Sequence, residues 1–260
     1  KGHEAILEYL QSLSHGSSSD DIDLSDQGLE RIPVHVMQFN TMKKLILDNN
    51  DLVQLPENLG ILKQLQVFSV VNNKVTALPD SMGMLNDLKE LVCDDNEITQ
   101  VPQTLGDLKA LERLSLRKND LRSLPQEIGN LHMLQDLDIR DNPNLHELPL
   151  ELGRIDHVKT FWFDIAPMTF PQQDVCLEGP RYVLKFLHVL YDASRTGKLD
   201  LSSAEYNLQS LLIPEERFAN LTELNLSRNF FSEIPDFLLR FTELRFLSME
   251  ENKIDSIPLG

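Results

Sequence analysis

Cysteine is scarce in this chain of 260 residues, which contains only Cys93 and Cys176. Two such residues cannot build a disulfide framework or a cysteine-based zinc site, so we expect a reducing compartment. The sequence also lacks any apolar run near the ~18 residues that a membrane-spanning helix requires, and no signal peptide is found at its start. These absences argue against a disulfide-stapled secreted fold and against a membrane span.

Basic residues are in short supply, with 24 Lys and Arg against 41 Asp and Glu, a formal net charge of −17. Such an acidic chain is repelled by the phosphates of nucleic acids and by anionic membrane surfaces. A protein partner that carries a basic patch is easier to accommodate.

Catalytic motifs are missing as well. The seven histidines are scattered, no Gly-rich phosphate loop follows a strand, and neither G-x-S-x-G nor H-E-x-x-H occurs. One stretch, residues 192–203, resembles the opening of a calcium-binding EF-hand loop, but Ser203 stands where the loop needs a bidentate Glu. The internal alignment described below explains residues 199–202 as a strand. We therefore predict that the chain is not an enzyme and uses no cofactor or metal.

What the sequence does contain is a regular spacing of asparagines. Five of them follow one another at 23-residue steps and two more resume the step later: Asn50, Asn73, Asn96, Asn119, Asn142, Asn229 and Asn252. Two apolar residues precede each asparagine at fixed offsets, and an apolar-Pro pair follows it. The pattern L-x-x-L-x-L-x-x-N-x-L-x-x-L-P is that of the leucine-rich repeat.

This pattern predicts an α/β leucine-rich-repeat solenoid with a right-handed parallel β-sheet on its concave face. Each repeat supplies a short strand whose leucines point inward, among them Cys93 as a small buried apolar residue. The asparagine side chain is expected to bond backbone groups that the turn leaves unpaired. Segments such as residues 57–64 then return along the convex face as short helical or irregular stretches, with glycines at their centres.

A second internal repeat predicts the domain organisation. A shift of 177 residues aligns residues 2–10 with 179–187 and residues 22–25 with 199–202. We expect a capping helix and Ser-rich loop over 1–21, a first repeat block over 22–171, a linking or capping helix over 172–198, and a second block over 199–260. The linking helix is expected between Gly179 and Asp192, and the decayed repeat with Ala166 in the asparagine position ends the first block.

The chain resembles intracellular leucine-rich-repeat scaffolds of the Ras-suppressor, scribble and plant Ras-group type. The likeness rests on the L-P-x-x-[LI]-G-x-L repeats of residues 42–158 and on the block-ending element matched by residues 1–10 and 178–187. It implies a cytoplasmic protein-binding platform in signalling, with a small GTPase or phosphatase class of partner. The asparagine position held by Ala166 and an irregular repeat at residues 200–218 depart from the family pattern.

The candidate binding site consists of the strand positions that flank the inward leucines, because these side chains point outward in register. Ile46, Val67, Val71 and Val92 are expected to make one apolar patch. Trp162 occupies an outward position, although packing against the linking helix is an equal alternative. The predicted protein-binding residues are Ile46, Asp48, Val67, Val71, Glu90, Val92, Asp94, Arg113, Arg117, Arg140 and Trp162.

These observations predict a non-catalytic scaffold that binds a protein partner on its concave face. Two alternatives stay open. The first is a regulatory repeat domain of a larger kinase or GTPase. The second is a receptor-like ectodomain, which the glycosylation sequons at Asn220 and Asn225 favour. The chain begins without methionine inside a block ending and stops just after Pro258. We therefore expect an interior fragment of a larger protein.

Overall fold

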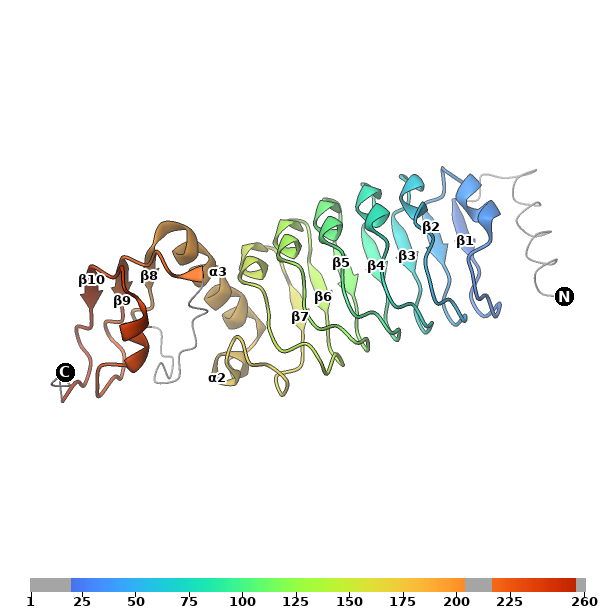
Figure 1. Ribbon diagram of the computed structural model, residues 1–260. Coiled ribbons are helices and arrows are strands. Elements are labelled where there is room, and N and C mark those ends of the chain that lie inside the picture. Colours follow the sequence, from blue (N-terminus) through green and yellow to red (C-terminus); the bar gives the residue numbers. More distant parts are fainter. Residues whose placement is uncertain (1–19, 204–216, 256–260) are drawn as a thin grey trace. The chain divides into compact units, whose positions relative to one another are not determined.

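The computed structural model describes residues 20–203 and 217–255 (Figure 1). These residues belong to two compact units, each of which is described by itself. Unit 1 comprises Lys1–Pro149 and Ile155–Pro167, and unit 2 comprises Leu150–Arg154 and Met168–Gly260. The expected N-terminal capping helix, most of the Ser-rich loop and most of the irregular repeat lie outside the described residues. The predicted division into blocks at residues 171 and 198 stays a prediction.

Unit 1 contains a parallel sheet of seven strands in sequence order, which confirms the predicted solenoid (Figure 1). Neighbouring strands pair at a step of 23 residues, except that β6 pairs with β7 at a step of 24. The strands are β1 (Asp21–Asp23), β2 (Lys44–Ile46), β3 (Val67–Ser69), β4 (Glu90–Val92), β5 (Arg113–Ser115), β6 (Asp136–Asp138) and β7 (Thr160–Trp162).

The core of unit 1 is built from the central residue of each strand and the residue two positions later. All of the central side chains are buried: Ile22, Leu45, Phe68, Leu91, Leu114, Leu137 and Phe161. Cys93 is fully buried among them, as predicted, and burial raises the pKa of its thiol. Because the side chains of a strand alternate in direction, the flanking residues point away from this core.

Short 3-10 helices form the other side of unit 1, as the return segments predicted (Figure 1). They are η1 (Val34–Gln38), η2 (Leu59–Ile61), η3 (Asp80–Met84), η4 (Gln103–Asp107) and η5 (Gln126–Asn130). Glycine is required where successive turns meet: a Cβ on Gly83 would lie 2.4 Å from the Thr104 carbonyl oxygen, and one on Gly106 would lie 2.4 Å from that of Glu127. The glycines therefore set how closely the repeats stack.

The asparagines form the predicted hydrogen-bond ladder. Asn119 donates from Nδ2 to the carbonyls of Cys93 (2.9 Å) and Leu116 (3.0 Å), and its Oδ1 accepts the Ile98 amide at 3.0 Å. The other asparagines of the ladder repeat the Nδ2 bonds, including Asn229 and Asn252 in unit 2. All of them except Asn229 also accept a backbone amide of the preceding repeat at Oδ1. Each of these buried or half-buried side chains thus satisfies backbone groups of two neighbouring repeats.

Unit 2 contains η6 (Leu150–Arg154), α2 (Gln173–Leu177), α3 (Pro180–Thr196) and η9 (Asp236–Arg240). Its parallel sheet has the order β10-β9-β8, formed by β8 (Lys198–Asp200), β9 (Glu223–Asn225) and β10 (Phe246–Ser248). Helix α3 packs on η6, where the His188 ring nitrogen Nδ1 lies 2.9 Å from the Gly153 carbonyl.

Helix α3 extends four residues beyond the predicted end at Asp192. It stops where Gly197 adopts a left-handed conformation with φ of 70°, a common helix ending. The stretch that resembles an EF-hand loop is thus divided between the last turn of α3 and strand β8. The strand predicted over residues 199–202 is present, but it lies at Lys198–Asp200.

Candidate protein-binding face

The outward side chains of β2–β7 and the three residues that follow each strand form one surface. We call this surface the strand face of unit 1. The structure brings all eleven predicted residues onto this face. Arg113, Arg117 and Trp162 are exposed there. The remaining eight side chains are half-buried: Ile46, Asp48, Val67, Val71, Glu90, Val92, Asp94 and Arg140.

The apolar part of the strand face lies on β2–β4. Strand pairing places Ser69 between Ile46 and Val92, and Ser69 is buried. Its hydroxyl donates to Asp48 Oδ1 at 2.6 Å. The predicted apolar patch is therefore interrupted by a hydrogen-bonded polar pair, which leaves apolar side chains on both sides of it.

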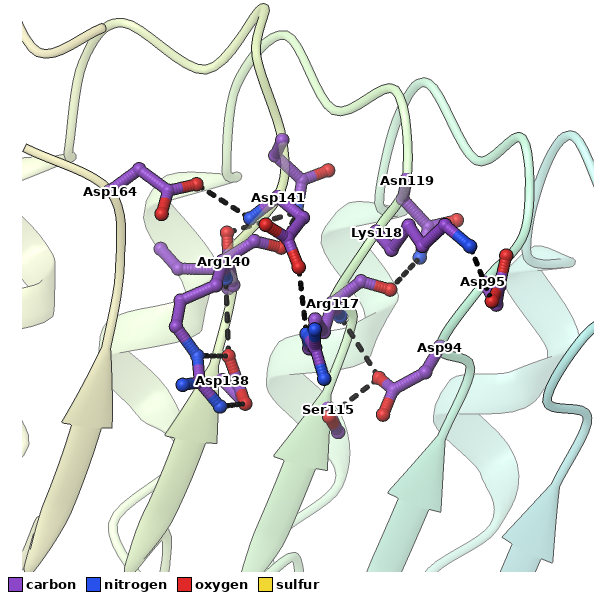
Figure 2. A network of polar contacts seen from close by, with 12 residues as sticks. Asp94, Asp95, Ser115, Arg117, Lys118, Asn119, Asp138, Arg140, Asp141 and Asp164 are labelled. Atoms are coloured by element: carbon purple, nitrogen blue, oxygen red, sulfur yellow. Dashed lines mark hydrogen bonds and ion pairs between the residues drawn. The ribbon is translucent and has the colours of Figure 1, made fainter. Parts of the chain in front are cut away.

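Two carboxylates of the strand face tie neighbouring repeats together in the same way. Asp48 Oδ1 also accepts the Val71 amide at 2.8 Å. Two repeats later, Asp94 Oδ1 accepts the Ser115 hydroxyl at 2.6 Å and the Arg117 amide at 2.9 Å (Figure 2). Burial raises the pKa of Asp94, and these hydrogen bonds offset only part of that effect. Both carboxylates hold the geometry of the face and are only partly open to a partner.

Ion pairs join acidic and basic side chains of neighbouring repeats on the strand face (Figure 2). Lys118 Nζ lies 2.7 Å from Asp95 Oδ2, and Arg117 Nε lies 2.7 Å from Asp141 Oδ2. The backbone amide of Asp141 donates to Asp164 Oδ2 at 2.5 Å. Charges of both signs therefore alternate over β4–β7 in fixed positions.

Trp162 points outward from β7, with 51% of its surface exposed. The Arg140 guanidinium lies over the ring, with its Cζ 4.9 Å from the ring centroid. Asp138 also holds Arg140, by accepting hydrogen bonds of 3.0 Å from Nε and 2.5 Å from Nη2. Burial raises the pKa of Asp138, but the hydrogen bonds and charge of Arg140 outweigh burial and lower it. The tryptophan thus takes the exposed alternative.

Several residues that organise the strand face were absent from the predicted set: Ser69, Ser115, Asp138, Asp141 and Asp164. The repeat step itself carries a signal for them, because a residue 23 or 24 positions later lies beside its counterpart on the next strand. Asp141, for example, follows Arg117 by 24 positions and pairs with it. Which of several carboxylates an arginine selects cannot be read from that step.

The described residues offer few side chains that could bind a metal ion or act as a nucleophile. Within residues 20–203 and 217–255, no three His, Cys, Asp or Glu side chains are grouped so that they could hold a metal ion. The Cys176 thiol is buried, which raises its pKa to about 12. Thiols of this kind are poor nucleophiles at neutral pH.

The described helices are also too short or too polar to cross a membrane.

Two family models match the chain. Residues 23–122 match the leucine-rich repeat region, and residues 220–241 match the Leucine Rich Repeat. Leucine-rich repeat-containing protein 10 is 45% identical in Bos taurus and 43% identical in Homo sapiens over 49 residues, which are 19% of this chain. These residues span only 18% of the length of either relative.

A solved structure is similar over most of the chain. The LRR ectodomain of the plant membrane receptor kinase GASSHO1/SCHENGEN3 from Arabidopsis thaliana, in complex with Casparian strip integrity factor 2, is 26% identical with a TM-score of 0.51. The match covers 89% of this chain and 24% of that chain. Repeat solenoids of this kind present extended surfaces to other proteins. The chain therefore has the leucine-rich-repeat fold, a protein-interaction architecture, and its residues 23–122 and 220–241 carry the repeat itself.

Proposed function

We propose that this chain is a non-catalytic scaffold that binds a protein partner through the strand face of unit 1. The observation that carries the proposal is the fixed placement of Arg140 between the Asp138 carboxylate and the exposed Trp162 ring. Tryptophan and arginine are enriched among the residues that dominate binding energy at interfaces. Side chains that are already held in place lose less conformational entropy when a partner docks.

The charge of the chain favours a partner with a basic patch, because the formal net charge is −17. Arg113, Arg117 and Arg140 stand among the carboxylates of β4–β7, so a docking surface with a matching alternation would be held in one register. The resemblance to Ras-suppressor and scribble scaffolds favours cytoplasmic signalling and a small GTPase or phosphatase as the partner class.

Affinity capture from a native lysate, with the captured proteins identified by mass spectrometry, tests this proposal. Trp162→Ala and Val71→Glu are the test variants, and Met84→Ala is the matched control, because Met84 is an exposed apolar residue of η3 on the opposite side. We expect both test variants to lose the proteins that the wild type and the control retain. Unchanged recovery by correctly folded Trp162→Ala and Val71→Glu would contradict the proposal.

Two alternatives keep the binding face but place the chain in a different kind of protein. The first is a regulatory domain within a larger kinase or GTPase, which the resemblance to intracellular repeat scaffolds implies. A receptor-like ectodomain is the second, favoured by the 26% identity to a receptor kinase ectodomain and by the exposed sequon residue Asn220. The mass of the native protein separates the settings: an N-glycan on Asn220 would place the chain outside the cytoplasm.

A further inference from the structure

The sheet of unit 2 has a hollow of about 610 Å³ over its outward side. Side chains from all three strands line it. The strand pairing sets Lys198, Glu223 and Phe246 side by side in one row, and Asp200, Asn225 and Ser248 in the next. Glu250, just after β10, completes the lining.

An aromatic side chain stands open at one end of this hollow. Phe246 is 67% exposed, and its neighbour across the sheet is Glu223. An exposed aromatic ring beside a carboxylate attracts organic cations, because the ring face and the carboxylate both carry negative potential. The aliphatic stem of a lysine or arginine can also cover the ring while its charged end stays in water.

The hollow carries an excess of negative charge. Three carboxylates line it against a single ammonium group, that of Lys198, which lies 2.7 Å from Glu223 Oε1. Asp200 and Glu250 are left without a cation in the described part of the chain. Burial raises the pKa of Asp200, but hydrogen bonds from Ser202 and Asn225 outweigh it and lower the pKa, so this carboxylate is ionised at neutral pH.

We propose that this hollow binds an extended protein segment that contains several arginine or lysine residues. One basic side chain lies across Phe246 beside Glu223, and others face Asp200 and Glu250. Acidic segments and nucleic acids are disfavoured, because their charges would meet the same carboxylates. This surface lies in the other unit and does not depend on the function proposed for the strand face of unit 1.

Fluorescence anisotropy on the whole chain tests the proposal, with a fluorescein-labelled peptide of alternating arginine and glycine as the probe. We expect Phe246→Ala and Glu250→Gln each to weaken binding by about fivefold. A peptide of alternating glutamate and glycine should not bind. Circular dichroism confirms that each variant is folded.

Two controls separate this site from general attraction to an acidic protein. Asp87→Asn removes one exposed negative charge from unit 1, and Trp162→Ala removes the anchor proposed for the strand face. Both are expected to bind the arginine peptide as the wild type does. The proposal is overturned if Asp87→Asn weakens binding as much as Glu250→Gln does, if Trp162→Ala abolishes binding, or if the wild type does not bind the peptide.

Discussion

At the scale of single residues, the asparagine ladder shows why one side-chain type recurs. The Asn119 side-chain amide is buried, donates to three backbone carbonyls and accepts one backbone amide. A residue that only donates, or only accepts, would leave part of this set unpaired away from water. Buried backbone groups without partners are costly, so the ladder is a structural requirement of each turn.

Asn119→Ala is expected to lower the free energy of unfolding by about 3 kcal/mol, because several buried backbone groups lose their partners at once. Urea denaturation measures the change. The matched control is Asn86→Ala, since the Asn86 side chain is exposed and makes no described hydrogen bond. This control should stay within about 0.5 kcal/mol of the wild type. Equal losses in the two variants would contradict a structural role for the ladder.

Two carboxylates of the strand face are expected to respond to pH in opposite directions. The pKa of Asp94 is raised by burial, so its ionised form costs stability as the pH rises above the ordinary value of 3.8. The pKa of Asp138 is lowered by Arg140, so it contributes stability above 3.8 that is lost as the pH falls through its depressed pKa. The signs follow from which protonation state the folded protein favours.

Asparagine variants measure this difference. At about pH 7, Asp138→Asn is expected to lose about 1 kcal/mol, because the partly exposed Arg140 loses its carboxylate. Asp94→Asn is expected to be as stable as the wild type or more so, because an amide oxygen can still accept from Ser115 and Arg117. Below pH 3.8, urea denaturation should show smaller differences in the free energy of unfolding between each variant and the wild type. A loss of stability in Asp94→Asn at neutral pH would count against burial as the dominant effect.

At the scale of elements, the spacing of the 3-10 helices depends on the absence of a side chain. Gly83 of η3 faces Thr104 of η4, and a Cβ there would lie 2.4 Å from the Thr104 carbonyl oxygen and 2.8 Å from its Cβ. Both of these atoms are fixed by the backbone, so a side chain cannot be accommodated by a rotamer change. The two turns would have to move apart.

Gly83→Ala is expected to lower the free energy of unfolding by about 1–3 kcal/mol through this overlap. Asp107→Ala is the control, because Asp107 belongs to η4 but is exposed. Thermal unfolding followed by circular dichroism compares the two variants. A stability of Gly83→Ala equal to that of the control would show that the stack tolerates a wider spacing.

The elements could be predicted because each one is encoded within about 23 residues of sequence. The strands, the 3-10 returns and helix α3 all have a local periodicity of apolar residues. The amphipathic pattern predicts an end of α3 at Asp192, four residues too early, because the pattern fades before Gly197 ends the helix. Geometry at a helix end depends on a backbone conformation that an apolar pattern does not report.

At the scale of the whole molecule, the dominant quantity is the charge. Because the formal net charge is −17, the excess negative side chains repel one another in any compact state. The exposed ion pairs offset little of this repulsion. Salt shortens the range of the repulsion, and at about 0.5 M it is screened within a few ångströms.

Sodium chloride is therefore expected to stabilise the protein. Raising its concentration from about 0.05 M to about 0.5 M should increase the thermal midpoint by about 2–5 °C, because net repulsion is lost faster than the weak surface pairs. Differential scanning fluorimetry measures the midpoint. Replacing the chloride by an equal concentration of sucrose controls for osmolarity. A midpoint that falls with salt would mean that the surface ion pairs outweigh the net charge.

The candidate site could be predicted only in part. The repeat step placed Trp162 and Arg140 on the same face, because it puts the outward residues of successive strands in register. The pairing of Arg140 with Asp138, and of Arg117 with Asp141, required the side-chain conformations. Several carboxylates lie within reach of each arginine, and a linear pattern does not choose among them.

The amino-acid sequence by itself determined the fold of this chain, its buried leucines and the hydrogen-bonding asparagines, because each depends on a period that repeats along the chain. Tertiary structure alone decided that Ser69 interrupts the apolar surface, that Asp48 and Asp94 are tied to neighbouring strands, and that Trp162 is exposed under Arg140. These features arise between residues on adjacent strands, where burial, hydrogen bonding and charge act through space.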